Sequence, residues 1–530
     1  MQKSETQSPE SKQTKIPLVA RWLLPTIGNT TFLLILYFLI KNGNGFLNDG
    51  DTGFHIRIGD LIRQTGSIPK IDPFSFTMSG HEWFAWEWLT DVLMSFIHSI
   101  YGLTGIICVA GIAICIVLML LYHRMLNREC NPFIAFFLTI LAAQVSGVHW
   151  LARPHLVSWI FLTLTSLILE SYRRNRTRWI YLLPLMVAVW ANLHGAFVML
   201  FPMLVIYGIG EIIRLKELKD DRPKAIRSIV KPYMLAGVLS ALTSLATPYG
   251  WILHKHIWNY LNDTSLLGII DEFRSPNFHT ILGKLVEIII FLVFLTVVQA
   301  VKKKRWIDIG LLVLFTHLML QSIRHIPLMA IITFPIIAEN ISELFGEIIN
   351  DITVTKNRLA RLSLNLKSLV QNNLAINRQL SGYGFYIIPP VLLCIMIAGP
   401  WGARIWNANF NPDRHPVDAS EFITKSDLPG NVYSTDEYGD YLIYRFYPKI
   451  KVFIDGRSDF YNSGPVLDDY GKLRKLDPSW SEVLGKYDVQ WMLLENDDPL
   501  GMIAQMSGSW ECIYKDDYSQ ILIKNQVSNN

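Results

Sequence analysis

Residues 23–60 read LLPTIGNTTFLLILYFLIKNGNGFLNDGDTGFHIRIGD, an apolar run that turns abruptly into a polar one. The apolar part, 23–41, has the length needed to cross a bilayer. The polar part brings Asp49, Asp51, His55 and Arg57 together within nine residues. A stretch this polar cannot enter lipid, so we expect it at the membrane surface. Most membrane proteins have no need of such a group there, and this makes it the first place to look for chemistry.

The apolar pattern of the first run recurs along the chain. The chain is 51% hydrophobic and 17% charged, whereas soluble domains are roughly 25% charged. We therefore predict a mainly α-helical, polytopic membrane protein with about 11 transmembrane helices. The expected spans are 23–41, 104–122, 132–148, 155–171, 179–194, 197–213, 231–247, 283–301, 306–321, 326–343 and 383–402.

The cations of the chain gather in alternate connections between these spans, for example at 124–128, 173–178 and 302–305. The positive-inside rule then predicts a cytoplasmic N-terminus and an outer C-terminus. Residues 1–22 are expected to be a disordered cytoplasmic tail in front of an uncleaved anchor. The basic, amphipathic segment 344–381 is predicted to lie on the cytoplasmic face, at the end of a membrane domain that covers 23–402.

Two parts of the chain are expected outside the membrane. The first outer loop, 43–102, holds two amphipathic helical patterns, 52–65 and 82–100, and the second is rich in the Trp residues typical of membrane interfaces. Residues 403–530 combine short β-rich runs at 432–434, 451–454, 491–494 and 520–523 with helical patterns at 418–426 and 478–487. This composition predicts a small outer α/β domain. The five cysteines show no metal or redox spacing.

Polar residues stand at the outer ends of spans that are far apart in sequence. Because these ends lie on one side of the membrane, their side chains could converge with the first loop into one site. The set consists of His149, Arg153 and His155, Asn192 and His194, Glu272 and Arg274, and Arg324 and His325.

Each of these residues also has a structural interpretation. The arginines could be interface residues that reach toward water, the histidines could cap helix ends, and Asn192 could bridge helices. Glu272 and Arg274 could form a solvated loop pair, and Asp49 and Asp51 a helix cap and a turn. Asp51 and His55 are four residues apart and share a helical face, and carboxylates suit Mg²⁺ or Mn²⁺. Asp49 and Asp51 are thus also the candidate metal ligands.

The arrangement of these motifs resembles the GT-C superfamily of membrane glycosyltransferases. Asp49-Gly50-Asp51-Thr52-Gly53-Phe54-His55 is similar to the DxDxxxH opening of large bacterial GT-C-type families. Further elements of the same kind are Asp72-Pro73-Phe74-Ser75, Glu87-Trp88-Leu89, Arg153-Pro154-His155, Asn192-Leu193-His194-Gly195 and Arg324-His325-Ile326-Pro327. The resemblance covers nearly the whole chain.

A second resemblance concerns the outer domain. Residues 434–441, followed by 452–457, are similar to the region after the last span of oligosaccharyltransferase catalytic subunits, where a Trp-Trp-Asp-Tyr-Gly motif contacts the acceptor. Only Tyr438 and Gly439 match that motif here, so recognition of a peptide acceptor is not carried over. Tyr438, Asp455 and Arg457 are candidate substrate contacts, and the alternative is that they are strand and turn residues of a packing domain.

The resemblance implies a function. GT-C enzymes transfer a sugar from polyprenyl phosphate or diphosphate to a lipid, glycan or protein acceptor on the outer side of the membrane, with inversion at the anomeric carbon. By this resemblance Asp51 would be the base, and Asp49 would support it or hold a metal, with His55 beside them. Arg153, Arg324 and His325 would stabilise the departing phosphate, and Arg57 with the remaining polar residues would contact substrate. A bacterial cytoplasmic membrane is the expected location.

Two other classes of function compete with this interpretation. A lipid or glycan transporter would carry ionisable residues near the bilayer midplane, where Glu287 is the clearest acid within a predicted span, and no inverted repeat is apparent. A non-catalytic envelope assembly factor would use the outer domain for docking. Nothing in the sequence indicates a nucleic-acid partner.

Overall fold

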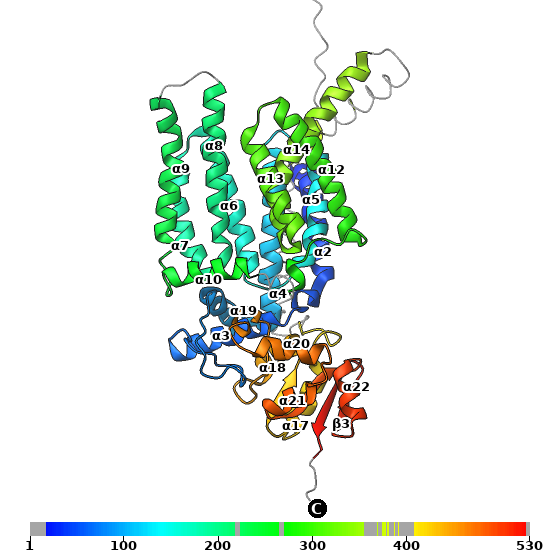
Figure 1. Cartoon of the computed structure of the whole chain (residues 1–530). Coiled ribbons are helices and arrows are strands. Elements are labelled where there is room, and N and C mark those ends of the chain that lie inside the picture. The colour runs from blue at the N-terminus through cyan, green and yellow to red at the C-terminus, as the bar shows by residue number, and fades with distance from the viewer. Residues whose placement is uncertain are drawn as a thin grey trace, which may run out of the picture.

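The computed structural model describes residues 17–217, 223–263, 270–354 and 408–525, together with a few positions between 368 and 391. The chain forms a bundle of long helices with a small α/β domain at one end of it (Figure 1). The predicted span 383–402, most of the segment 344–381 and the first sixteen residues lie outside the described residues. A short helix, α1 (Leu18–Leu23), lies inside the range predicted as a disordered tail.

Long helices account for most of the bundle. Each predicted span from 23–41 to 326–343 falls on a helix or on a short 3₁₀ turn that continues into one. The bundle helices are α2 (Ile27–Asn42), α4 (Trp88–Leu126), α5 (Pro132–Ser146), α6 (His155–Asn175), α7 (Leu183–Leu193), α8 (Leu200–Glu217), α9 (Pro223–Thr243), α12 (Ile281–Lys302), α13 (Trp306–Gln321) and α14 (Ile326–Val354). The 3₁₀ turns are η1 (Gly43–Leu47), η2 (Gly147–His149), η3 (Arg178–Leu182), η4 (Gly195–Met199), η5 (Asp271–Phe273) and η6 (Ile323–His325).

Seven stretches in the described ranges are long and apolar enough to cross a membrane. They are Val19–Leu47, Trp88–Leu126, Pro132–His149, His155–Asn175, Gly195–Glu217, Ile281–Lys302 and Ile323–Ile348, and Arg178–Leu193 and Trp306–Gln321 are shorter apolar helices. The mainly helical class with several apolar helices and a small mixed sheet is therefore confirmed, while the count of eleven spans stays a prediction.

Local chemistry explains where several of these helices begin. Thr26 and Asn29 form a reciprocal capping box at the start of α2, in which each side chain accepts the other residue's backbone N–H. Asn131 accepts the N–H of Phe133 at the start of α5, with Pro132 in the first turn. Caps of this kind stabilise a helix by about 1 kcal/mol.

The first outer loop differs in one respect from its prediction. Its first helix, α3 (Asp51–Thr65), lies where the 52–65 pattern placed it. The second begins at Trp88 rather than at residue 82 and runs on into the span as α4, with a kink at Gly102. Residues before Trp88 are extended because Ile71 and Glu82 form an antiparallel bridge, in which the N–H of Trp83 donates to the Lys70 carbonyl. A further helix, α10 (Trp251–Asn262), was not predicted.

The C-terminal domain contains a four-stranded sheet in the order β1-β2-β4-β3. β1 (Asn431–Ser434) is parallel to β2 (Val489–Glu495), and β4 (Ser519–Lys524) is antiparallel to β2 and β3 (Trp510–Lys515). The helices are α17 (Val417–Lys425), α18 (Asp436–Phe446), α19 (Ser458–Tyr461), α20 (Val466–Arg474), α21 (Trp480–Lys486) and α22 (Pro499–Met506). The predicted runs at 432–434, 491–494 and 520–523 are strands, and the two helical patterns are α17 and α21.

The predicted strand at 451–454 is wrong. Val452 forms a single parallel bridge with Ser75 of the first outer loop instead of joining the sheet. Its N–H donates to the Phe74 carbonyl, and its own carbonyl accepts from Phe76. The apolar residues of this segment are buried where the loop meets the domain. An apolar run of this length predicts burial, but it does not show whether the segment forms the hydrogen bonds of a strand.

The first outer loop and the C-terminal domain share one hydrophobic core. Phe54, Ile58, Phe74 and Met78 of the loop belong to the same buried cluster as the residues of the sheet. Such continuous burial fixes α3 against the domain on one side, while α4 packs on its other side. The start of α3 is thereby held between the membrane bundle and the domain.

Candidate functional site

A cavity of about 210 Å³ lies where α3, the start of α4, the 149–155 turn, α10, η5, η6 and α19 meet. Figure 1 shows α3, α10 and α19 together at this junction between the helical bundle and the C-terminal domain. The site residues predicted from sequence that line it are Asp51, His55, His149, Arg153, His155, His194, Glu272, Arg324, His325 and Arg457. Side chains from distant parts of the chain do converge, as the sequence analysis expected.

Arg153 is the centre of an ion-pair network in this cavity. Its Nη1 lies 2.7 Å from Asp49 Oδ2 and 2.9 Å from Glu272 Oε1, and its Nη2 contacts Asp51. Asp49 also accepts the N–H of Asp51 at 2.9 Å, which fixes the first turn of α3. Three carboxylates therefore surround one guanidinium.

Arg324 has a different environment. Its Nε is 3.8 Å from Glu272 Oε2, and its guanidinium lies 4.8 Å from the centre of the Phe273 ring. The Tyr260 ring lies 5.6 Å from that of Phe273, so aromatic side chains form this wall of the cavity. Arg324 is partly exposed and is held less tightly than Arg153 by carboxylates, which leaves its planar donors better placed for an anion.

A chain of polar side chains leads from α3 through Glu87 to His194. His55 Nδ1 lies 2.6 Å from Asp91 Oδ1, and its Nε2 faces Glu87 at 3.8 Å. The other oxygen of Glu87 lies 3.4 Å from His194 Nε2. His194 Nδ1 accepts the N–H of Ala196, so a neutral ring carries its proton on Nε2 and points it at Glu87. Glu87 thus holds two imidazoles in the cavity wall.

The C-terminal domain packs the backbone of Gly456 against the Asp51 carboxyl group. The N–H of Gly456 donates to Asp440 Oδ1 at 3.1 Å. A Cβ at Gly456 would lie 2.3 Å from Asp51 Oδ1 and 2.8 Å from Asp440 Oδ2. Two carboxyl groups, one from each part of the chain, therefore meet at a position that only glycine leaves open.

Burial governs the protonation of these acids. It raises the pKa of Asp51 to about 7 against the opposing effect of Arg153. It likewise raises the pKa of Glu87 to about 7 against His55, and it raises that of Asp440 well above its ordinary value, with Asp51 adding to the effect. Burial would also raise the pKa of Glu272, but Arg153 and Arg324 outweigh it and lower the pKa to about 2. Asp51 and Glu87 thus change charge near neutral pH, whereas Glu272 stays ionised.

Of the remaining histidines in the cavity wall, His149 is buried and His155 and His325 are partly buried. His155 Nε2 donates to the His149 carbonyl at 3.0 Å, and His325 Nδ1 is 3.2 Å from the Leu318 carbonyl. The Nε2 atom of His149 is buried without a hydrogen-bond partner in the described structure, although its ring lines the cavity. An unsatisfied buried polar atom is costly, and a ligand in the cavity could satisfy it.

Besides Asp455, four predicted substrate contacts lie outside the cavity wall. Asn192 accepts the Trp88 indole N–H and donates to the carbonyls of Ala188 and Ala246, so it bridges helices. Arg57 donates to the Tyr444 carbonyl and to Asp60. Tyr438 is buried in the domain core, and the Arg274 carbonyl accepts the N–H of Ile323.

Arg457 lines the cavity and Asp455 does not, and the charged groups of both join the loop and the domain. Arg457 pairs with Asp455 at 2.6 Å and with Asp72 at 2.8 Å, and it lies 4.6 Å from the Trp83 ring. Both residues are buried. Their predicted role as substrate contacts is therefore less well supported than a structural one.

The predicted Mg²⁺ or Mn²⁺ site finds no support in the geometry. Asp49 and Asp51 both contact Arg153, and the described residues contain no group of three or more His, Cys, Asp or Glu placed to hold a metal ion. A cation would have to replace the guanidinium between the two carboxylates. No metal step is derived for this site.

Several cavity residues were missed from sequence. Glu87 and Trp86 were noted only as parts of sequence patterns, and Tyr260 and Asp459 were not considered. Asp440, which meets Asp51 at Gly456, was noted only within the stretch 434–441. Glu87 could have been found from its position between two Trp residues in an outer loop. Asp440 gave no signal, because its nearness to Asp51 depends on how the domain docks.

Two solved structures resemble the chain in overall arrangement. One is an oligosaccharyltransferase from Archaeoglobus fulgidus in complex with Zn and sulfate, with 11% sequence identity and a TM-score of 0.49 over 89% of this chain and 68% of that chain. The other is ArnT from Cupriavidus metallidurans bound to undecaprenyl phosphate, with 13% identity and a TM-score of 0.47 over 94% of this chain and 98% of that chain.

Both structures are GT-C glycosyltransferases, the superfamily that the sequence resembles. At this identity and these TM-scores the likeness assigns the chain no substrate and no activity. No protein-family model and no curated protein matches the chain.

Proposed function

We propose that the chain transfers a sugar from a polyprenyl phosphate or diphosphate carrier to an acceptor, with inversion at the anomeric carbon, in the cavity at Asp51. One observation carries the proposal: the Asp51 carboxyl, whose pKa is raised by burial to about 7, lies in the same cavity as the guanidinium groups of Arg153 and Arg324. A base and cations that stabilise a leaving phosphate are the two requirements of this reaction.

Arg324 is the better candidate of the two arginines for the phosphate. Its contact with Glu272 is long and its guanidinium faces the cavity beside Phe273. Arg153 has three carboxylate partners, so it would have to give up one of them to bind a phosphate. We assign to Arg153 the task of orienting Asp51 and to Arg324 the direct contact.

Asp51 would accept the proton of the acceptor hydroxyl or amide as that group attacks the anomeric carbon. Arg153 on one oxygen and Gly456 beneath the other restrict the carboxylate to one orientation. His55, Glu87 and His194 would line the side where the sugar lies and offer hydrogen-bond donors to its hydroxyls. Trp86 and Tyr260 add apolar faces suited to a sugar ring.

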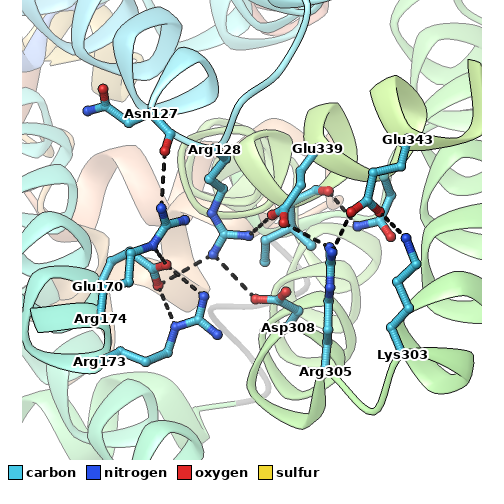
Figure 2. Close-up of polar contacts among 12 residues, drawn as sticks. Asn127, Arg128, Glu170, Arg173, Arg174, Lys303, Arg305, Asp308, Glu339 and Glu343 are labelled. Atoms are coloured by element: carbon cyan, nitrogen blue, oxygen red, sulfur yellow. Dashed lines mark hydrogen bonds and ion pairs between the residues drawn. The ribbon is translucent and has the colours of Figure 1, made fainter. Parts of the chain in front are cut away.

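We further propose that this cavity faces the outer side of a bacterial cytoplasmic membrane. The support comes from the cations Arg128, Arg173, Arg174 and Arg305, which lie close together (Figure 2). They lie at the other end of the bundle, because α4 and α6 begin at the cavity and end beside Arg128 and Arg174. The positive-inside rule places that end in the cytoplasm. Glu287 of α12 is exposed and does not line the cavity, so it lends no support to a transporter.

The test is Asp51→Asn in membranes that contain polyprenyl-phosphate sugars. The substitution keeps the shape of the side chain but removes the base, so transfer of labelled sugar should fall by at least about a hundredfold, the usual contribution of acid–base catalysis. Expression and membrane insertion should be unchanged. Asp60→Asn on the same helix, where Asp60 pairs with Arg57 outside the cavity, is the matched control. Full transfer by Asp51→Asn would overturn the assignment.

A further inference from the structure

A second cavity lies at the end of the bundle opposite Asp51. α4 begins beside the candidate site and ends at Leu126, so Arg124 lies in its last turn and Arg128 follows its far end. The cavity has a volume of about 320 Å³. Its wall includes Arg124, Asn127, Arg128, Ser166, Glu170 and Arg174.

Positive charge exceeds negative charge on this wall. Glu170 is the one carboxylate that lines the cavity within the described ranges, and it is shared by Arg128 at 3.4 Å, Arg173 at 2.7 Å and Arg174 at 2.7 Å (Figure 2). Arg128 also reaches Asp308 and Glu339. Arg173 and Arg174 form ion pairs with no other carboxylate in this part of the chain.

Arg124 has only neutral partners. One of its Nη atoms donates to the Ile331 carbonyl at 2.6 Å, and the other donates to the Ser166 hydroxyl. The carbonyl of Ile331 needs such a donor because Pro335, four residues on in α14, has no N–H. A neutral side chain could also donate to this carbonyl, so the contact does not require the positive charge of Arg124. Among the described residues, no carboxylate forms an ion pair with Arg124.

We infer that this cavity binds a phosphate group, supplied by the headgroup of an anionic lipid or by free phosphate. Arginine forks match the oxygens of a phosphate. Arg124 of α4, Arg128 in the turn after α4 and Arg174 of the neighbouring helix α6 border one cavity. Basic pockets between membrane helices hold anionic headgroups in this way. Asn127 and Ser166 add neutral polar groups. The site is independent of the proposed reaction, because it lies at the other end of α4.

The experiment uses the purified full chain in detergent, titrated with phosphatidylglycerol, phosphatidylcholine or inorganic phosphate. Binding is followed by native mass spectrometry and by the unfolding temperature, which a ligand of the folded state raises. We expect phosphatidylglycerol to bind at least about tenfold more tightly than phosphatidylcholine, the effect of one charge-assisted pair. A shift given by inorganic phosphate instead would support the phosphate site and name free phosphate as its source.

Two variants and one control complete the test. Arg174→Gln changes a partly exposed side chain, so it should fold and lose most of the preference for the anion, and Arg124→Gln should do the same. Arg214→Gln is the control, because Arg214 pairs with Glu211 near this end but does not line the cavity. Equal binding of both lipids with no effect of phosphate, or loss in the control equal to that in Arg174→Gln, would overturn the inference.

Discussion

Asp51 combines two properties that rarely occur together in a carboxyl group, a guanidinium partner and a raised pKa. An ion pair with Arg153 alone would lower the pKa of Asp51. Burial between α3, Arg153 and the Gly456 backbone outweighs it and raises the pKa to about 7. The side chain can therefore take up a proton near neutral pH and release it again.

The pH dependence of transfer follows from this pKa. Asp51 acts as a base only when ionised, so the rate should rise about tenfold per pH unit below pH 7 and level off above it. The free energy of unfolding should change in the opposite sense and fall as the pH rises. A carboxyl whose pKa is raised on folding stabilises the fold at low pH, and that contribution is lost as the pH rises through about 7.

Two measurements check these opposite trends. One is the initial rate of sugar transfer from pH 5 to 9, and the other is the unfolding temperature over the same range. Asp51→Glu should retain a pH-dependent rate with a shifted midpoint. A rate that is flat across pH 7 in the unsubstituted chain, with chemistry shown to limit it, would contradict the role of Asp51.

The residues of the site could be predicted to different degrees. Asp51, Arg153, Glu272 and Arg324 were found because charged side chains at membrane-helix ends need a reason to be there. Asn192 also stands at the end of a predicted span, but its amide donates to two backbone carbonyls and does not line the cavity. Sequence cannot separate these cases, because the difference lies in which partners the fold supplies.

At the scale of elements, the close packing of α3 on α4 positions His55. A Cβ at Gly59 would lie 2.0 Å from the Asp91 carbonyl oxygen and 2.6 Å from Ser95 Cβ. The first contact is with backbone, which cannot rotate away. This approach brings His55, one turn earlier on α3, within 2.6 Å of the Asp91 side chain.

Gly59→Ala should therefore separate the two helices. We expect a loss of about 1–3 kcal/mol in the free energy of unfolding, the usual cost of overpacking, and reduced transfer because His55 moves with α3. Thermal unfolding and transfer assays measure the two effects. Gly471→Ala in α20 is the control, since nothing lies within 4 Å of its added Cβ. Equal stability of both variants would contradict the expected overpacking between α3 and α4.

Element boundaries were predictable where local signals set them. The 52–65 pattern gave α3, and the apolar runs gave the bundle helices. The start of α4 and the segment 451–454 were misplaced because both pair with other parts of the outer loop or the domain. Long-range pairing of this kind leaves no local trace in the sequence.

At the scale of the whole molecule, the first outer loop and the C-terminal domain behave as one unit that carries the site. Their shared core places Phe74 of the loop among the residues of the sheet. Asp72 pairs with Arg457 across this boundary at 2.8 Å, and both side chains are almost completely buried. From the sequence the loop was predicted to belong to the membrane domain, because nothing in either segment shows that they share a core.

Asp72→Ala tests whether the first outer loop and the C-terminal domain form one unit. It removes one of the two carboxylates that pair with the buried guanidinium of Arg457. Because Asp455 keeps its ion pair, we expect a loss smaller than about 3–5 kcal/mol, the cost of a fully broken buried pair. If loop and domain are one unit, limited proteolysis should open the stretches around 66–80 and 448–465 together. Asp477→Ala, at an exposed carboxylate that accepts from Ser479, is the control and should leave both protected. Cleavage of the loop with a fully protected domain would mean that the domain is stable without it. The site at Asp51 would then depend on docking between two independent parts rather than on one shared core.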